Sequence, residues 1–183
     1  MKKHNGMRPL DIVVLAKIIS YSHDEWKTRH LANDLKISLS EISESLNRSM
    51  IGGLLDATKR KVFRKNLLDF LQYGMKYVFP AVVGTTTIGV PTAHSAPFFN
   101  KIFIASDGYV WPYQDGVFKG IIIEPLHQSV PLCIQNDQVL YEILAAIDLL
   151  RIGRPREVKV AVETLTVLFD TKITNDAPQS SPN

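Results

Sequence analysis

The apolar positions between Thr28 and Leu55 have the spacing of two short helices joined by a tight turn. In the first segment Leu31, Ala32 and Leu35 form one apolar stripe, and Ile37 fills the turn. The second segment has a stripe of its own, formed by Ile42, Leu46, Ser49 and Met50. Two amphipathic segments in this order predict a helix-turn-helix.

The second segment has a clear start and a polar outer face. Ser38 is followed three residues later by Glu41, which is a capping-box pattern, so we expect this helix to begin at Ser38 or Leu39. Short hydrogen-bonding side chains on its outer face are the type that reads base edges in the major groove of DNA. The alternative is an ordinary solvated face of a small helical domain. The predicted base-facing residues are Ser40, Ser43, Glu44, Asn47 and Arg48.

A basic cluster follows this helix. Gly52-Gly53 ends the helix, Leu54-Leu55 begins a short strand, and five positive charges then fall within residues 59–65. A recognition helix followed by a basic turn is the order in which winged helices grip DNA phosphates. The predicted phosphate contacts are Lys59, Arg60, Lys61 and Lys65.

Residues 8–65 resemble the winged helix-turn-helix of bacterial transcriptional regulators in the broad MarR class, mainly through the run ISLSEISESLNRSMIGGLLD. The chain departs from that family after Asp56, where the long hairpin wing is missing. The whole chain also resembles a group of uncharacterised bacterial helix-turn-helix proteins through GVPTAHSAP, VWP, IIIEPL and LLRIGRPRE. Some proteins of that group look like antitoxins or autoregulators.

The remaining pattern predicts an α+β fold. Helical spacing from residue 60 to 79, capped near Thr58, predicts one long helix that leaves only a rudimentary wing. Residues 81–97 form an extended or looping connector, followed by a small antiparallel β meander with strands at 102–105, 109–111 and 117–124 and turns at 106–108 and 115–116. A C-terminal helical hairpin follows, with a first helix capped at Asn136 or Asp137 and ending at Gly153, and a second helix beginning at Pro155.

Charge and composition divide the chain at about residue 80. Residues 1–80 hold 14 basic and 8 acidic residues, whereas residues 81–183 hold 7 and 10. A basic half joined to a mildly acidic one fits a nucleic-acid reader attached to a second module. We therefore expect a DNA-binding domain at 1–80, a small α+β domain at 81–173 and a disordered tail at 174–183.

The candidate enzymatic and metal-binding residues are sparse. His94-Ser95 and His127 lack the elbow motif and the acidic partner of a nucleophilic site. His94, His127 and Cys133 lack paired-ligand spacing, so we predict no metal, cofactor or catalysis. A single cysteine and no apolar run near the roughly 18 residues of a membrane span indicate a cytoplasmic protein.

Two features of the second half leave alternatives open. The aromatic group near Trp111 is core and turn packing, the wall of a pocket or a partner-binding surface, and its members are Tyr109, Trp111, Pro112, Tyr113 and Phe118. Arg151, Arg154 and Arg156 surround the turn between the last two helices. They either bind phosphate or an acidic partner, or have a structural role in which Arg151 pairs with Asp148 three residues before it.

The sequence as a whole predicts a transcriptional regulator, in the first instance a repressor, that binds double-stranded DNA as a homodimer. The dimer element would be the helix at 60–79 or the C-terminal helices. Two alternatives stay open: an antitoxin whose second half binds a toxin or other protein, and a regulator that responds to a ligand held in a pocket between the GVPTAHSAP loop and the Trp111 hairpin.

Overall fold

The computed structural model describes residues 6–21, 25–103 and 107–170. Helices α1 to α5 come first and span Pro9–Ser20, Thr28–Leu35, Leu39–Ile51, Arg64–Tyr73 and Met75–Val78. Strand β1 (Val83–Thr92), the short 3-10 helix η1 (Ala93–Ser95), and strands β2 (Tyr109–Pro112) and β3 (Phe118–Ile123) follow. Helices α6, α7 and α8 span Val130–Cys133, Gln138–Ile152 and Pro155–Asp170. The predicted α+β class is confirmed.

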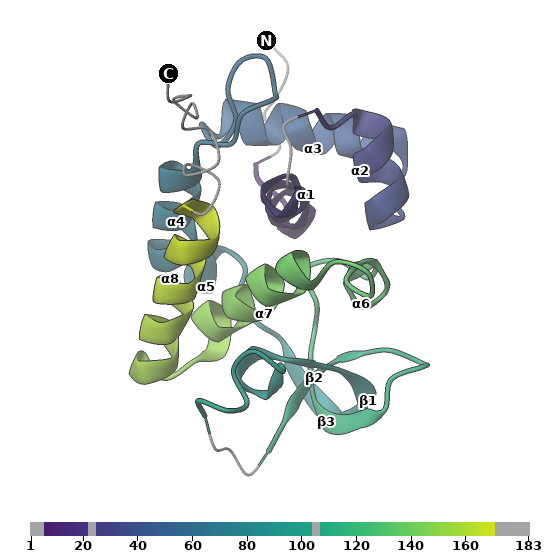
Figure 1. Ribbon diagram of the computed structural model, residues 1–183, viewed down its shortest axis with the longest axis vertical. Coiled ribbons are helices and arrows are strands. Elements are labelled where there is room, and N and C mark those ends of the chain that lie inside the picture. Colours follow the sequence, from purple (N-terminus) through teal and green to yellow (C-terminus); the bar gives the residue numbers. More distant parts are fainter. Residues whose placement is uncertain (1–5, 22–24, 104–106, 171–183) are drawn as a thin grey trace, which may run out of the picture.

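Helix α1 lies at the centre of the molecule. Its residues from Leu10 to Ile19 are all buried, as expected for a helix that is apolar on nearly every side. It packs against α3 on one side and α7 on the other, and Figure 1 shows it end-on between them. One hydrophobic cluster therefore contains residues from both halves of the chain, from Leu10 to Phe169.

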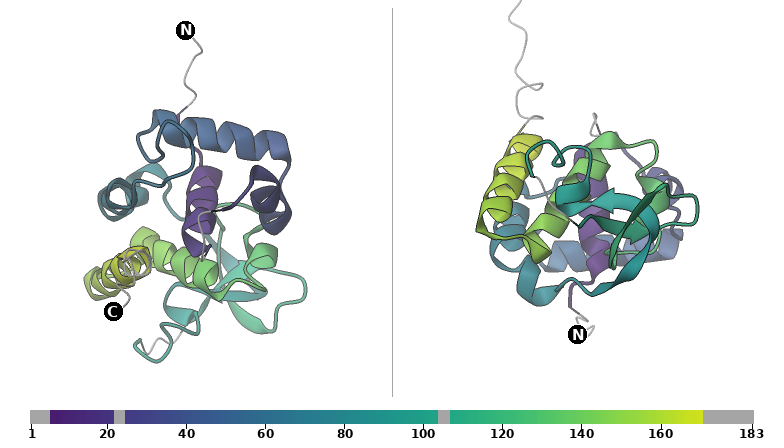
Figure 2. Two further views of the ribbon diagram at one scale, coloured as in Figure 1. Left: turned by 45° about the horizontal axis from the view of Figure 1, so that its top comes forward. Right: turned by 90° about the horizontal axis from the view of Figure 1, so that it is seen from below.

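Residues 28–51 form two helices joined by a tight turn, as their apolar pattern predicts. Leu31, Leu35 and Ile42 are fully buried, and Ile37 in the turn is buried as well. Lys36 adopts the left-handed conformation between the helices (φ 57°), and its N–H donates to the carbonyl of Ala32. Figure 2 shows α3 lying across one end of the molecule.

The predicted single helix over residues 60–79 is wrong at its start and in its middle. Residues 60–63 are not helical, because Val62 pairs with Leu55 in an antiparallel bridge. Thr58 does not cap a helix but donates its hydroxyl to the Asp56 carboxylate. Gly74 then separates α4 from α5, and a Cβ there would lie 3.0 Å from the Phe70 carbonyl oxygen.

The sheet is mixed rather than an antiparallel meander. Strand β1, which covers much of the predicted connector, pairs antiparallel with both β2 and β3, while β2 and β3 pair in parallel. Gly89 and Gly116 allow this closure, since a Cβ on Gly116 would lie 2.5 Å from the Gly89 backbone. The turn at 115–116 is thus not a hairpin between neighbouring antiparallel strands. Ile102 and Phe103 do not form the predicted strand at 102–105. Residues 104–106, which include the end of that strand and the start of the predicted turn at 106–108, lie outside the described residues.

The C-terminal helical hairpin is confirmed. The Asp137 side chain caps α7 by accepting the N–H of Leu140 at 2.8 Å, and Gly153 ends the helix. Asp137 also accepts from Lys17 at 2.8 Å and from the Ser20 hydroxyl at 2.6 Å, both on α1. Burial opposes ionisation of Asp137, but these hydrogen bonds outweigh it and lower its pKa. This cluster ties the start of α7 to the helix-turn-helix half, and α8 lies beside α4 (Figure 1). The predicted tail at 174–183 lies outside the described residues.

Candidate nucleic-acid interface

The start of α3 is fixed by a capping box. The Ser38 hydroxyl oxygen accepts the N–H of Glu41 at 3.2 Å, and the same hydroxyl donates to the Glu41 carboxylate at 2.8 Å. The hydrogen bonds that the Glu41 carboxylate accepts from the Ser38 hydroxyl and the Ser38 N–H lower the pKa of Glu41. The predicted helix start at Ser38 or Leu39 is therefore confirmed.

Helix α3 has a buried face and an exposed one. The buried face turns toward α1 and α2 and includes Ile42, Ser45, Leu46 and Ser49. Four of the predicted base-facing residues are exposed, and their spacing places them on one side of the helix. We call this set the α3 polar face: Ser40, Ser43, Glu44 and Asn47.

The prediction that Arg48 belongs to this face is wrong. Arg48 is only 8% exposed, and its guanidinium group pairs with the fully buried Asp11 of α1. Its Nε lies 2.9 Å from Asp11 Oδ2 and its Nη2 lies 2.6 Å from Oδ1. The same carboxylate also accepts the Arg8 N–H at 2.8 Å, at the start of α1. Arg48 therefore locks α3 onto α1, because a buried two-point ion pair tolerates little rotation of either helix.

The turn at residues 56–61 is held by the Asp56 carboxylate. It accepts the N–H groups of Arg60 at 2.7 Å and of Lys61 at 2.8 Å, in addition to the Thr58 hydroxyl. The hydrogen bonds from the Thr58 hydroxyl and the Lys61 N–H lower the pKa of Asp56 to about 2. With the Leu55–Val62 bridge at its base, the turn is a short, well-fixed loop beside the end of α3.

The predicted phosphate contacts divide into two kinds. Lys59 donates to the side-chain oxygen of Asn47, and Arg60 stacks 5.0 Å from the centre of the Trp26 ring while donating to the Trp26 carbonyl. Lys61 and Lys65 are exposed and have no ion pair with any residue that the structure describes. Among the four predicted contacts, these two lysines are the cations best placed to take a phosphate group.

Sequence reasoning missed three further basic side chains at the helix-turn-helix. Lys27 and Arg29 are exposed at the start of α2, and Lys36 is exposed in the turn before α3. In helix-turn-helix complexes the first helix crosses the DNA backbone, so cations at its ends are phosphate candidates. Their position beside the predicted first helix was the signal that could have identified them.

Other candidate chemistry in the chain is engaged in the fold. Ser95 Oγ accepts the Tyr109 N–H at 2.8 Å, and the His127 ring lies 2.9 Å from the Ser129 hydroxyl. Burial raises the pKa of the Cys133 thiol to about 12, so little of it is the reactive thiolate at neutral pH. Within the described ranges, no three His, Cys, Asp or Glu side chains gather as a metal site would require.

Comparisons with known proteins give no family assignment. No family model, curated protein or solved structure matches the chain significantly. None of the helices in the described parts of the chain is both long enough and apolar enough to cross a lipid bilayer.

Proposed function

We propose that the protein is a sequence-specific DNA-binding transcriptional regulator with a winged helix-turn-helix and a rudimentary wing. The α3 polar face enters the major groove, and the 56–61 turn takes the place of a wing at the flanking phosphates. The observation that supports this most directly is the division of α3 into a buried face locked by Arg48–Asp11 and an exposed polar face. A reading helix needs both, because its side chains must be accessible and its angle must be fixed.

The charge distribution supports the same proposal. Lys61 and Lys65 are exposed close to the end of α3, and Lys36 is exposed before its start. Cations near both ends of the α3 polar face could contact the phosphates that border the groove. Glu44 lies within the face, where a carboxylate can accept from cytosine N4.

The test begins with selection of a binding sequence from a random pool of duplex DNA. Asn47→Ala should weaken binding to the selected duplex by about 1–3 kcal/mol and binding to random DNA much less, because base contacts discriminate between sequences. Gln72→Ala, which removes an exposed amide from α4, is the matched control and should bind both duplexes like the wild type. Failure to enrich any sequence, or equal losses on both duplexes, would contradict the proposal.

The proposed DNA-bound state is a homodimer, because one short helix reads too few bases for high specificity. A strip of exposed apolar side chains from α4 to β1 supplies a surface that a second copy would cover. Its members are Tyr73, Tyr77, Val78, Val82 and Val83.

Tyr77, 80% exposed within this strip, is the position at which to test the dimer. Tyr77→Lys should shift the sedimentation of the protein toward the monomer. Val117→Lys, at a position 98% exposed in the β2–β3 loop, should not. Identical sedimentation of the Tyr77 variant and the wild type would exclude this strip as the dimer contact.

A further inference from the structure

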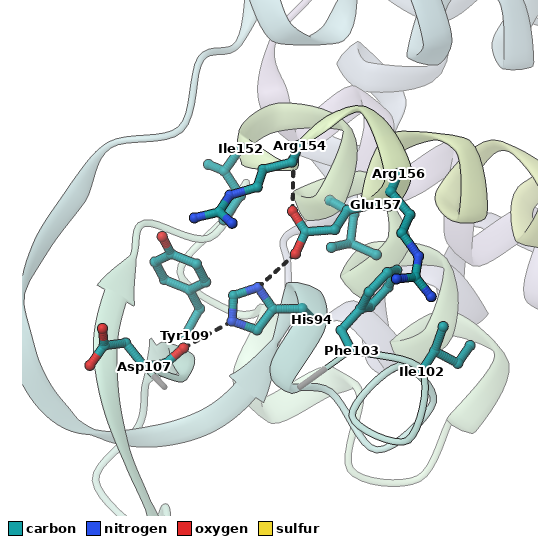
Figure 3. A pocket seen from close by; sticks show the side chains of 10 residues that line it. His94, Ile102, Phe103, Asp107, Tyr109, Ile152, Arg154, Arg156 and Glu157 are labelled. Atoms are coloured by element: carbon teal, nitrogen blue, oxygen red, sulfur yellow. Dashed lines mark hydrogen bonds and ion pairs between the residues drawn. The ribbon is translucent and has the colours of Figure 1, made fainter. Parts of the chain in front are cut away.

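A cavity of about 630 Å³ lies between the segment that follows β1 and the turn that joins α7 to α8. Figure 3 shows it from close by, and Figure 1 places the α7–α8 turn at the end of the molecule away from α3. Its volume falls within the roughly 300–1,000 Å³ typical of small-molecule sites.

One part of the cavity wall is apolar. Leu149 and Ile152 come from the last turns of α7, and Ile102 and Phe103 come from the segment after η1. The Tyr109 ring at the start of β2 adds a further wall and lies 5.0 Å from the centre of the His94 ring. A ligand with an apolar or aromatic body would find matching contacts here.

The acidic group at the centre of the cavity is already paired. The Glu157 carboxylate lies 3.2 Å from His94 Nδ1, and its other oxygen accepts the Arg154 N–H at 2.7 Å. The remaining nitrogen of His94 lies 2.9 Å from the carbonyl oxygen of Asp107. The Glu157 carboxylate thus caps α8 and holds the histidine, as the dashed lines in Figure 3 show.

Two arginine side chains at the cavity lack such partners. Arg154 and Arg156 are exposed, and neither guanidinium group has an ion pair with any residue in the described part of the chain. In Figure 3 they lie on opposite sides of the Glu157–His94 pair, with Arg154 toward Tyr109 and Arg156 toward Phe103. Arg151, the third arginine of this turn, is buried and paired with Asp148 at 2.7 Å.

We propose that this cavity binds a small organic anion. Arg154 on one side of the Glu157–His94 pair and Arg156 on the other supply the positive charge that attracts the anionic group, and their planar donors suit carboxylate, sulfonate or phosphate oxygens. The apolar body of the ligand lies against Phe103, Ile152 and Tyr109. Apolar walls with a few charged donors are a common composition of such sites.

The test uses two fluorescent probes that share an aromatic body. 1-Anilinonaphthalene-8-sulfonate carries a sulfonate, and N-phenyl-1-naphthylamine is its uncharged counterpart. The wild type should bind the sulfonate probe saturably with one site per chain and at least tenfold more tightly than the neutral probe. Absence of a saturable site, or equal affinity for the two probes, would overturn the proposal.

Substitutions of the two arginines test whether the sulfonate probe binds in this cavity. Arg154→Ala/Arg156→Ala should weaken binding of the sulfonate probe at least tenfold while leaving the neutral probe and the thermal melting curve nearly unchanged, because both side chains are exposed. Lys159→Ala, which removes a cation 77% exposed on the same helix, is the control and should bind like the wild type. Undiminished sulfonate binding by the double variant would place the probe elsewhere, for example on the α4–β1 apolar strip, and would also overturn the proposal.

Discussion

Each half of the molecule buries one arginine against an aspartate, but the two pairs serve different purposes. Arg48 and Asp11 lie on separate helices 37 positions apart, and their pair fixes the angle of a helix whose opposite face is exposed. Arg151 and Asp148 lie three positions apart on α7, and their pair holds the interior of the second half together. Buried charge therefore orients a surface in one region and organises a core in the other.

The Asp148 carboxylate connects three elements. One oxygen accepts from the Thr92 hydroxyl of β1 at 2.8 Å and from the Trp111 indole of β2 at 2.7 Å. The other accepts from Arg151, whose guanidinium group also donates to the carbonyl oxygens of Phe79 and Glu124. Burial raises the pKa of Asp148, and the charge of Arg151 opposes that shift.

Removing the Asp148 carboxylate should have the largest effect. Asp148→Ala leaves a buried guanidinium group unpaired, which costs about 3–5 kcal/mol, and orphans two further donors at about 1–3 kcal/mol each. Since domains are stable by about 5–15 kcal/mol, we expect loss of the folded state or a much lower urea midpoint. Glu163→Ala, at an exposed position of α8, is the control. A loss below about 1 kcal/mol would show that the carboxylate does not hold this core together.

Breaking the Arg48–Asp11 pair should have the second largest effect on stability. Arg48→Ala leaves the Asp11 carboxylate buried and unpaired, so the free energy of unfolding should fall by about 3–5 kcal/mol in urea denaturation. Asp11→Leu/Arg48→Met should restore most of that loss, because apolar pairs of similar volume often replace buried ion pairs.

The same two variants distinguish an Arg48 side chain buried against Asp11 from the outward orientation that helical spacing predicts. The stable double variant should still bind the selected duplex. If Arg48→Ala instead destabilised the protein by less than about 1 kcal/mol and selectively weakened DNA binding, Arg48 would belong to the α3 polar face.

The capping box at the start of α3 should have the smallest of these effects. Ser38→Ala should destabilise the protein by about 1 kcal/mol in urea denaturation, because the Glu41 N–H loses its partner. Ser40→Ala, two residues further along and exposed, should change stability by less than about 0.5 kcal/mol. Equal effects of the two substitutions would show that the Ser38 cap adds nothing particular to helix stability.

The sequence predicted features that depend on neighbouring residues. The apolar stripes of α2 and α3, the Ser38 cap, and the Asp137 and Gly153 ends of α7 are all local signals, and the structure has them. The Arg151–Asp148 pair is also a local signal, because residues three apart meet on one helix face. It is one of the two roles that the sequence predicts for the arginines at the α7–α8 turn.

Contacts between distant segments could not be read from local spacing. Nothing near Arg48 in the sequence indicates that Asp11 lies opposite it. Helical periodicity alone therefore predicts, wrongly, that the arginine points outward. The parallel pairing of β2 with β3 depends on the close approach of Gly89 and Gly116, 27 positions apart. The cavity at Arg154 and Arg156 likewise requires the η1 segment to meet the α7–α8 turn.

The central claim is that the exposed cations beside α3 contact DNA phosphates, and the salt dependence of binding tests it most directly. Each phosphate contact adds about −0.9 to the slope of log affinity against log salt concentration. Lys61→Ala/Lys65→Ala should make that slope shallower by about 2 for each bound subunit and weaken selected and random duplexes alike. Lys101→Ala/Lys159→Ala, which removes two exposed cations from the other half, should leave the slope unchanged. An unchanged slope in the Lys61 and Lys65 variant would contradict the account.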